Sequence, residues 1–108
     1  MPYPIRLLVP IAAAAFMALP ATAQEITLKV HHFWPPGAMP PSTLLTPWCD
    51  RIAKDSNNRM KCQIYPAMQL GGAPPQLFAQ ARDGVVDITW TVLGYTPGRF
   101  PKTEVFEL

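Results

Sequence analysis

The sequence has 108 residues, of which 49% are hydrophobic and 15% are charged, and its formal net charge is +2. This composition excludes a disordered or fibrous chain, and the length allows at most one domain. The cationic residues are scattered along the chain, which argues against nucleic acid as a partner.

Residues 1–23 have the features of a secretory signal peptide. Arg6 provides a positive charge, residues 7–19 form an uncharged apolar run, and Ala21-Thr22-Ala23 is a small-x-small cleavage site. The apolar run is shorter than the roughly 20 residues that a membrane-spanning helix needs. We therefore predict cleavage after Ala23, export, and no membrane insertion of residues 24–108.

The first segment after this leader has the pattern of a strand. Apolar and polar residues alternate over residues 26–32, which is the period of a strand with one buried face. Phe33-Trp34-Pro35-Pro36-Gly37 ends this strand, because consecutive prolines remove two amide donors. A helix is then expected to have Ser42 or Thr46 as its N-cap and to end near Ser56. Its apolar residues recur at three-to-four spacing and form one buried stripe: Leu44, Leu45, Trp48, Cys49, Ile52 and Ala53.

A second strand is predicted over residues 60–65, after a turn at residues 57–59. Cys49 on the helix stripe and Cys62 on the apolar face of this strand are the only cysteines. An oxidising compartment permits a disulfide between them, which would stabilise the fold by roughly 3 kcal/mol in the chain-entropy model. Two separate buried thiols are the alternative. A metal site is disfavoured, because two cysteines without further ligands nearby do not complete a tetrahedral set.

The rest of the chain adds a second helix and a third strand. After a loop at residues 68–72, a helix is expected to start near Pro74 and to end at Gly84. Its predicted buried residues are Leu77, Phe78 and Ala81. Residues 85–93 are rich in β-branched side chains and predict a strand. Strands that alternate with helices in this way demand an α/β fold, in which helices flank a parallel sheet in a βαβαβ arrangement.

Three motifs, taken in their order along the chain, resemble the solute receptors of tripartite ATP-independent periplasmic (TRAP) transporters. They are the proline-rich turn after the first strand, IYPAMQLGG at the end of the second, and ARDGVVDI before the third. The resemblance implies a periplasmic protein of two α/β domains that close around a small organic anion and present it to membrane subunits. Members of the family are several times longer. Residues 24–108 are therefore expected to be a truncated N-terminal domain, without the arginine that usually pairs with the substrate carboxylate.

The predicted binding residues lie where the strands end. Ligands of open parallel sheets bind beyond the carboxyl ends of the strands, where Phe33 and Trp34 follow the first strand and Trp90 and Tyr95 end the third. The glycine-containing loop at Gln69 to Gly72 allows close approach of the backbone to a ligand, with Gln69 and Gly71 as its candidate contacts. Trp90 is equally well explained as a core residue, because an aromatic side chain inside a strand usually packs.

Histidine and arginine residues are further candidates for the same edge. His31 and His32 are adjacent in a strand and so point to opposite faces, which disfavours a shared metal ion and favours structural or rim roles. Arg99 could reach an anion, but a lone arginine in a loop is more often solvated.

The sequence contains no serine elbow, phosphate-cradling glycine loop or His-Glu metal motif, so we expect neither catalysis nor a cofactor. The leading prediction is a periplasmic binding component that captures a small carboxylate, such as a dicarboxylate or a 2-oxo acid, for uptake. One alternative is an exported enzyme or disulfide-stapled module with a reactive cysteine or histidine. Another is a non-functional truncated product. The chain alone is expected to bind organic acids weakly or not at all, because half of the cleft wall would be missing.

Overall fold

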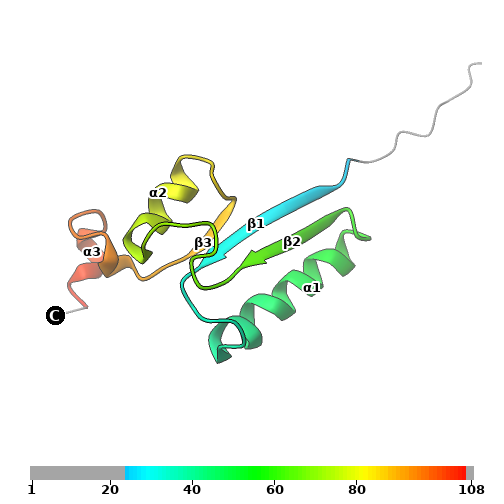
Figure 1. The fold of residues 1–108 in the computed structure, drawn as a ribbon, viewed down its shortest axis with the longest axis horizontal. Coiled ribbons are helices and arrows are strands. Elements are labelled where there is room, and N and C mark those ends of the chain that lie inside the picture. The colour runs from blue at the N-terminus through cyan, green and yellow to red at the C-terminus, as the bar shows by residue number, and fades with distance from the viewer. Residues whose placement is uncertain (1–23, 107–108) are drawn as a thin grey trace, which may run out of the picture.

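The computed structural model describes residues 24–106, so the predicted signal peptide lies outside the described residues. Three strands, β1 (Ile26–His32), β2 (Met60–Tyr65) and β3 (Ile88–Trp90), form one sheet in the order β2-β1-β3. Both pairings are parallel. The sheet and its flanking helices (Figure 1) confirm the predicted α/β architecture.

The two long strands have the bounds that the alternation pattern predicts. They pair in register from Ile26 opposite Met60 to His31 opposite Tyr65. Prolines after each strand fix both carboxyl ends, and the turn before β2 is made by Asn57 and Asn58, which adopt left-handed backbone conformations with φ of 52° and 60°. Asparagine tolerates this conformation better than most residues, so the predicted turn is confirmed.

The third strand is much shorter than the predicted residues 85–93. Val85 and Val86 still donate their N–H groups to the Gln80 carbonyl of the preceding helix, at 2.9 and 3.4 Å. After Trp90 the chain leaves the sheet and forms a 3-10 turn at Leu93–Tyr95. Because β3 pairs only with residues 30–32 of β1, it extends the sheet at the carboxyl end and leaves the amino half of β1 paired with β2 alone.

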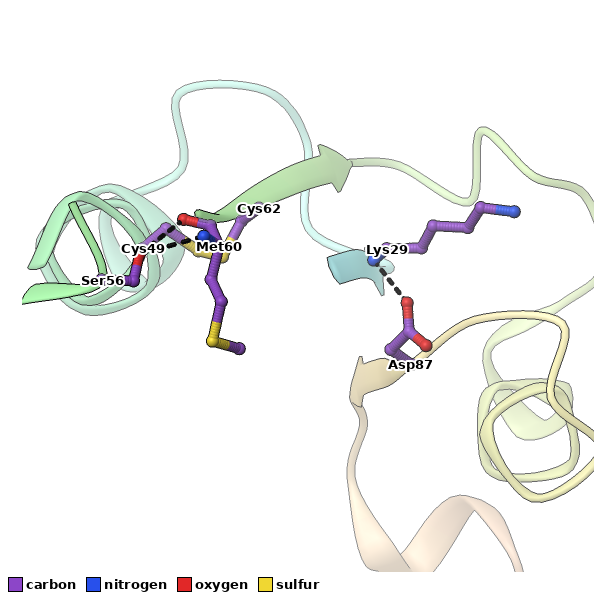
Figure 2. Close-up of a disulfide and its surroundings, with 6 residues drawn as sticks. All are labelled: Lys29, Cys49, Ser56, Met60, Cys62 and Asp87. Atoms are coloured by element: carbon purple, nitrogen blue, oxygen red, sulfur yellow. Dashed lines mark hydrogen bonds between the residues drawn. A yellow bond between two sulfur atoms is a disulfide. The ribbon is translucent and has the colours of Figure 1, made fainter. Parts of the chain in front are cut away.

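One face of the sheet is covered by a π-helical turn, η1 (Pro41–Leu45), that continues into α1 (Thr46–Asp55). Neither of these segments has a side-chain N-cap, so the predicted capping by Ser42 or Thr46 is wrong. The helix ends at Asp55 with Ser56 as its C-cap, as predicted, and the Ser56 hydroxyl accepts a 3.0 Å hydrogen bond from the Met60 N–H (Figure 2).

The predicted apolar stripe of the first helix is correct for only part of its length. Leu45 and Cys49 are buried, and Ile52 and Ala53 are half-buried. Leu44 and Trp48 were predicted to be buried but are 63% and 43% exposed. Each lies one residue before a buried one and is therefore turned about 100° away from the sheet. They line a surface pocket of about 300 Å³ together with Leu45 and Trp90.

The core between the sheet and α1 is held by apolar packing and by a disulfide. Val30, Leu45 and Cys49 form the buried cluster, and residues from β2 and β3 pack against it: Cys62, Ile64, Ile88 and Trp90. Cys49 and Cys62 are joined by a disulfide with their Cα atoms 5.6 Å apart (Figure 2). The bridge confirms the predicted pairing over separate thiols, and no cysteine of the chain remains free.

The opposite face is covered only near the carboxyl ends of the strands. A 3-10 turn, η2 (Pro74–Gln76), leads into α2 (Leu77–Arg82), and Leu77 is fully buried there. Phe78 and Ala81 are half-buried, and Gly84 ends the segment with φ +76°. A last short helix, α3, spans Pro101–Glu104. No helix within residues 24–106 is long and apolar enough to cross a bilayer. In Figure 1, α1 and α2 lie on opposite sides of the strands.

A carboxylate completes the junction between β1 and β3. The Lys29 N–H donates a 2.8 Å hydrogen bond to the Asp87 carboxylate (Figure 2), and the Asp87 N–H donates to the Lys29 carbonyl at 3.1 Å. These two hydrogen bonds link β1 to the chain one residue before β3 begins. Asp87 is therefore engaged in holding the sheet together.

Candidate ligand-binding surface

The four aromatic residues predicted to line the site are in contact with one another. The rings of Phe33 and Trp34 are stacked with their centroids 4.8 Å apart. Tyr95 meets the Phe33 ring edge-on at 5.7 Å, and Trp90 meets the Trp34 ring edge-on at 6.5 Å. Edge-to-face and offset-stacked rings at these separations attract one another beyond their area burial. The result is a continuous row of rings at the carboxyl edge of the sheet, which we call the ring row.

The position of Trp90 is compatible with both interpretations that the sequence left open. Its side chain packs against the buried cluster of Val30, Leu45 and Cys49, and its ring also contacts Trp34. Phe33, Trp34 and Trp90 are half-buried, whereas Tyr95 is 39% exposed. The ring row therefore continues from the core out to the solvent-facing surface.

The loop after β2 lies across the end of β1. The Ala67 N–H donates to the Trp34 carbonyl at 2.8 Å, and the Met68 N–H donates to the His32 carbonyl at 3.1 Å. Ala67 and Met68 take left-handed backbone conformations, with φ of 50° and 58°. These bonds place residues 66–72 beside the strand end from which Phe33 and Trp34 emerge.

Three amides of the loop, those of residues 69–71, already have hydrogen-bond acceptors within the protein. The N–H of Gln69 donates to the Pro66 carbonyl at 3.1 Å, that of Gly71 donates to the Met68 carbonyl at 2.8 Å, and that of Leu70 donates to His31 Nε2 at 3.3 Å. All three donors are used within the protein. What remains available is the exposed Gln69 side chain and the open space beside Gly71, where an added Cβ would meet nothing within 4 Å.

The two histidines at the end of β1 are both buried and lie on different sides of the sheet. His31 bonds with Gln80 of α2, while His32 borders a pocket with Ser42 and Thr46 of η1 and α1. Burial, followed by the neighbouring His31, lowers the pKa of His32, so its neutral form is favoured in the fold. These positions agree with structural roles. Within residues 24–106, no three His, Cys, Asp or Glu side chains are arranged to hold a metal ion.

The loop arginine is engaged away from the ring row. The Arg99 guanidinium lies 4.6 Å from the centre of the Phe78 ring, and Phe78 meets Phe100 edge-on at 5.4 Å. A guanidinium at this distance from a ring is held by a cation–π attraction. The contact ties the segment around Arg99 to α2.

Sequence reasoning missed the side chains that hold the loop. His31 and Gln80 both bond to the glycine segment, with the Gln80 amide donating to the Gly71 carbonyl at 3.1 Å. One signal was available, because Gln76 and Gln80 are four residues apart and so share a helix face directly after Gly72. The partner of His31 could not be read from its own segment, because Gln80 lies 49 residues further along the chain.

The comparison with known families fits this arrangement. The profile of the family described as "Bacterial extracellular solute-binding protein, family 7" matches residues 30–108. The chain belongs to this family. Its solved structural neighbours are TRAP solute-binding proteins, so the resemblance found in the sequence is confirmed. The family and these neighbours are binding proteins rather than enzymes, as expected.

Three solved structures of TRAP solute-binding proteins illustrate the similarity. A marine metagenome protein from an unidentified microbe, specific for aromatic acids and crystallised with 3-hydroxybenzoate, is 55% identical with a TM-score of 0.74, and the match covers 77% of this chain and 26% of that one. A Rhodoferax ferrireducens T118 protein with copurified benzoate is 52% identical with a TM-score of 0.72, covering 75% and 25%. A Desulfovibrio salexigens DSM2638 protein is 30% identical with a TM-score of 0.68, covering 78% and 26%. The chain thus spans about a quarter of the length of these relatives.

Proposed function

We propose that this family 7 chain contributes one wall of a TRAP-type receptor site for an aromatic carboxylate. The observation that carries the proposal is the ring row, in which Tyr95, Phe33, Trp34 and Trp90 contact one another in series. A ligand ring gains edge-to-face or stacking attraction against such a surface. The relatives that are 52–55% identical were solved with 3-hydroxybenzoate and benzoate, which supports the same ligand class.

The chemistry of the predicted site residues favours an aromatic acid over a dicarboxylate. Phe33, Trp34, Gln69, Gly71, Trp90 and Tyr95 are all uncharged. A dicarboxylate brings two negative charges, and a charge taken out of water needs an ionic or hydrogen-bonding partner. We propose that Phe33, Trp34 and Trp90 contact the ligand ring, that the Tyr95 hydroxyl and the Gln69 amide donate hydrogen bonds to its polar groups, and that Gly71 leaves space beside them.

The partners follow from the family. We propose that the protein is exported after cleavage behind Ala23, works in the periplasm and delivers its ligand to the membrane subunits of a TRAP transporter. N-terminal sequencing of the exported protein should begin at Gln24. A sequence that begins at Met1 would contradict the predicted cleavage.

The alternative of an exported enzyme with a cysteine nucleophile is disfavoured, because both cysteines are in the disulfide. No described contact favours the alternative of a non-functional product.

The ligand class is best tested in a chimera as well as in the chain itself. Residues 24–108 would replace the aligned segment of the marine metagenome relative, which is 55% identical, and calorimetry would compare benzoate with succinate and pyruvate. We expect benzoate to bind at least tenfold more tightly than either competitor in the chimera, and weakly or not at all to the 108-residue chain. Tighter binding of succinate or pyruvate would contradict the proposal.

A further inference from the structure

The His31 imidazole connects three separate segments at the carboxyl edge. The side chain starts on β1 and is fully buried. Its Nδ1 lies 2.6 Å from Oε1 of Gln80 on α2, and its Nε2 lies 3.3 Å from the N–H of Leu70 in the loop. The Gln80 amide nitrogen in turn lies 3.1 Å from the Gly71 carbonyl. The two side chains thereby form a closed circuit with the loop backbone.

Only one arrangement of protons satisfies this circuit. A backbone N–H can only donate, so the Leu70 amide requires Nε2 of His31 to be the acceptor and to carry no proton. The proton of the neutral ring is then on Nδ1, which donates to Gln80 Oε1. With its oxygen facing His31, Gln80 directs its amide nitrogen to the Gly71 carbonyl. The opposite tautomer would place two N–H groups against each other at Leu70.

The next residue of the loop, Gly72, lies close to the same glutamine. Gly72 has φ +83°, and a Cβ built on it would lie 2.7 Å from Oε1 of Gln76 and 3.1 Å from Nε2 of Gln80. The Gln76 oxygen already accepts a 2.7 Å hydrogen bond from the Ala73 N–H. Residues 70 and 71 are therefore each hydrogen-bonded by a side chain from another segment, and Gly72 packs against the side chains of Gln76 and Gln80. Gln69 directly precedes these three residues.

We propose that His31 and Gln80 are positioning residues for the binding loop and that His31 performs this role as the neutral tautomer with its proton on Nδ1. They set where Gln69 and Gly71 stand relative to the ring row without contacting the ligand themselves. The consequence for ligand affinity rests on the proposed function. The proton position and the fixed loop do not.

The first test is a spectroscopic signature of the proton position. His31 and His32 are the only histidines of the chain, so long-range ¹H–¹⁵N correlation of ¹⁵N-histidine-labelled protein at pH 7.5 resolves each ring. We expect the His31 pattern of a neutral ring protonated at Nδ1. A pattern of protonation at Nε2, or of a doubly protonated ring, would overturn the proposal.

The second test measures the loop by amide hydrogen exchange. His31→Asn retains a donor toward Gln80 but removes the acceptor for Leu70, and Gln80→Leu removes both of its hydrogen bonds. We expect exchange to be about tenfold faster at the Leu70 amide in His31→Asn and at the Gly71 amide in Gln80→Leu. Gln63→Leu, an exposed site on the adjacent strand, serves as the matched control and should leave both amides unchanged. Unchanged exchange in both loop variants would overturn the proposal.

A third variant, more conservative than the first two, separates loss of the hydrogen bonds from loss of folding. Gln80→Glu still offers His31 an acceptor but removes the donor to the Gly71 carbonyl, so the His31 signature should persist while exchange at the loop rises. Loss of the signature with an intact fold would contradict the proposed circuit. None of these three experiments uses a ligand. The proposed function is tested separately, by the benzoate calorimetry.

Discussion

Two regions of this small sheet are held together by different kinds of interaction. On the face that α1 covers, the helix is joined to β2 by the disulfide and by apolar contacts around Val30 and Leu45. At the carboxyl edge the buried side chains include two histidines, and directional hydrogen bonds and ring contacts hold the loop and the aromatic residues. The stability of the first region depends on the apolar area that it buries and on the disulfide. The second region depends on the orientation of its hydrogen bonds and rings.

This difference predicts how each region responds to change. Apolar burial is not directional, so substitutions around α1 should alter the free energy of unfolding. Hydrogen bonds and ring contacts require specific orientations, so substitutions at the carboxyl edge that remove only such a contact should alter ligand affinity and loop position more than global stability. Changes there that strain the backbone or charge a buried side chain should lower stability as well. The core and the ring row share one residue, Trp90, and otherwise consist of different side chains.

The largest effect is expected from removing the disulfide. Cys49→Ala with Cys62→Ala should lower the free energy of unfolding by about 3 kcal/mol, because the bridge closes a loop across 13 positions. Urea denaturation of the oxidised protein and of the double variant measures the difference. Reducing agent should then have no effect on the variant, and equal stability of the two proteins would contradict the role given to the bridge.

Next in size is a comparison of two neighbouring glycines. Gly71 and Gly72 both have left-handed φ, but only Gly72 lies against the glutamine side chains. Gly72→Ala should cost about 2 kcal/mol, because backbone strain adds to a displaced hydrogen bond of Gln76. Gly71→Ala, the control, should cost about 1 kcal/mol from strain alone. Thermal denaturation of both variants tests this order, which equal destabilisation would contradict.

Substitutions in the ring row should weaken ligand binding more than substitution of an aromatic residue outside it. Trp34→Ala should weaken benzoate binding in the chimera about tenfold, because ring contacts contribute roughly 0.5–1.5 kcal/mol each. Phe106→Ala is the control, since Phe106 follows α3, is 88% exposed and lies outside the ring row. Calorimetry of both variants gives the comparison. A larger loss for the Phe106 variant would place the site elsewhere.

Stability should also depend on pH through His32. Burial and the neighbouring His31 lower the pKa of this histidine in the folded protein, so the unfolded chain binds the proton more readily. The free energy of unfolding should therefore be fully developed above about pH 6.5 and should fall as the pH drops below it. Urea denaturation at pH 7.5 and 5.5 measures the change, which should shrink in His32→Leu. A wild-type protein that gains stability at pH 5.5 would contradict this assignment.

The smallest effect is expected on the outer face of α1. Arg51 and Asp55 form an ion pair at 3.5 Å with both side chains largely exposed. Such pairs contribute little in water, so Asp55→Asn should change the free energy of unfolding by less than about 0.5 kcal/mol. Urea denaturation at low and high salt is the measurement. A loss comparable to that of the disulfide variant would show that α1 is held by charge rather than by its apolar face.

The parts of the fold that were predictable are those governed by local pattern. Alternation with a following proline located β1 and β2. The length of β3 was overestimated because Val85 and Val86 remain bonded to Gln80 of α2, a tertiary choice that their β-branched side chains do not reveal. The exposure of Leu44 and Trp48 likewise depends on how η1 turns into α1 over the sheet.

The candidate site divides in the same way. That the rings gather at one edge follows from parallel topology, because the carboxyl ends of parallel strands lie on the same side. The internal use of the loop amides and the positions of His31 and Gln80 come from contacts between distant segments. Periodicity within one segment carries no information about such contacts.

The central claim, that the ring row binds the aromatic ring of a carboxylate ligand, is tested most directly by a crystal structure of the chimera with benzoate. The account predicts the benzoate ring in van der Waals contact with Phe33, Trp34 or Trp90, with the Gln69 side chain beside it. A bound benzoate that touches none of the four aromatic residues would contradict it.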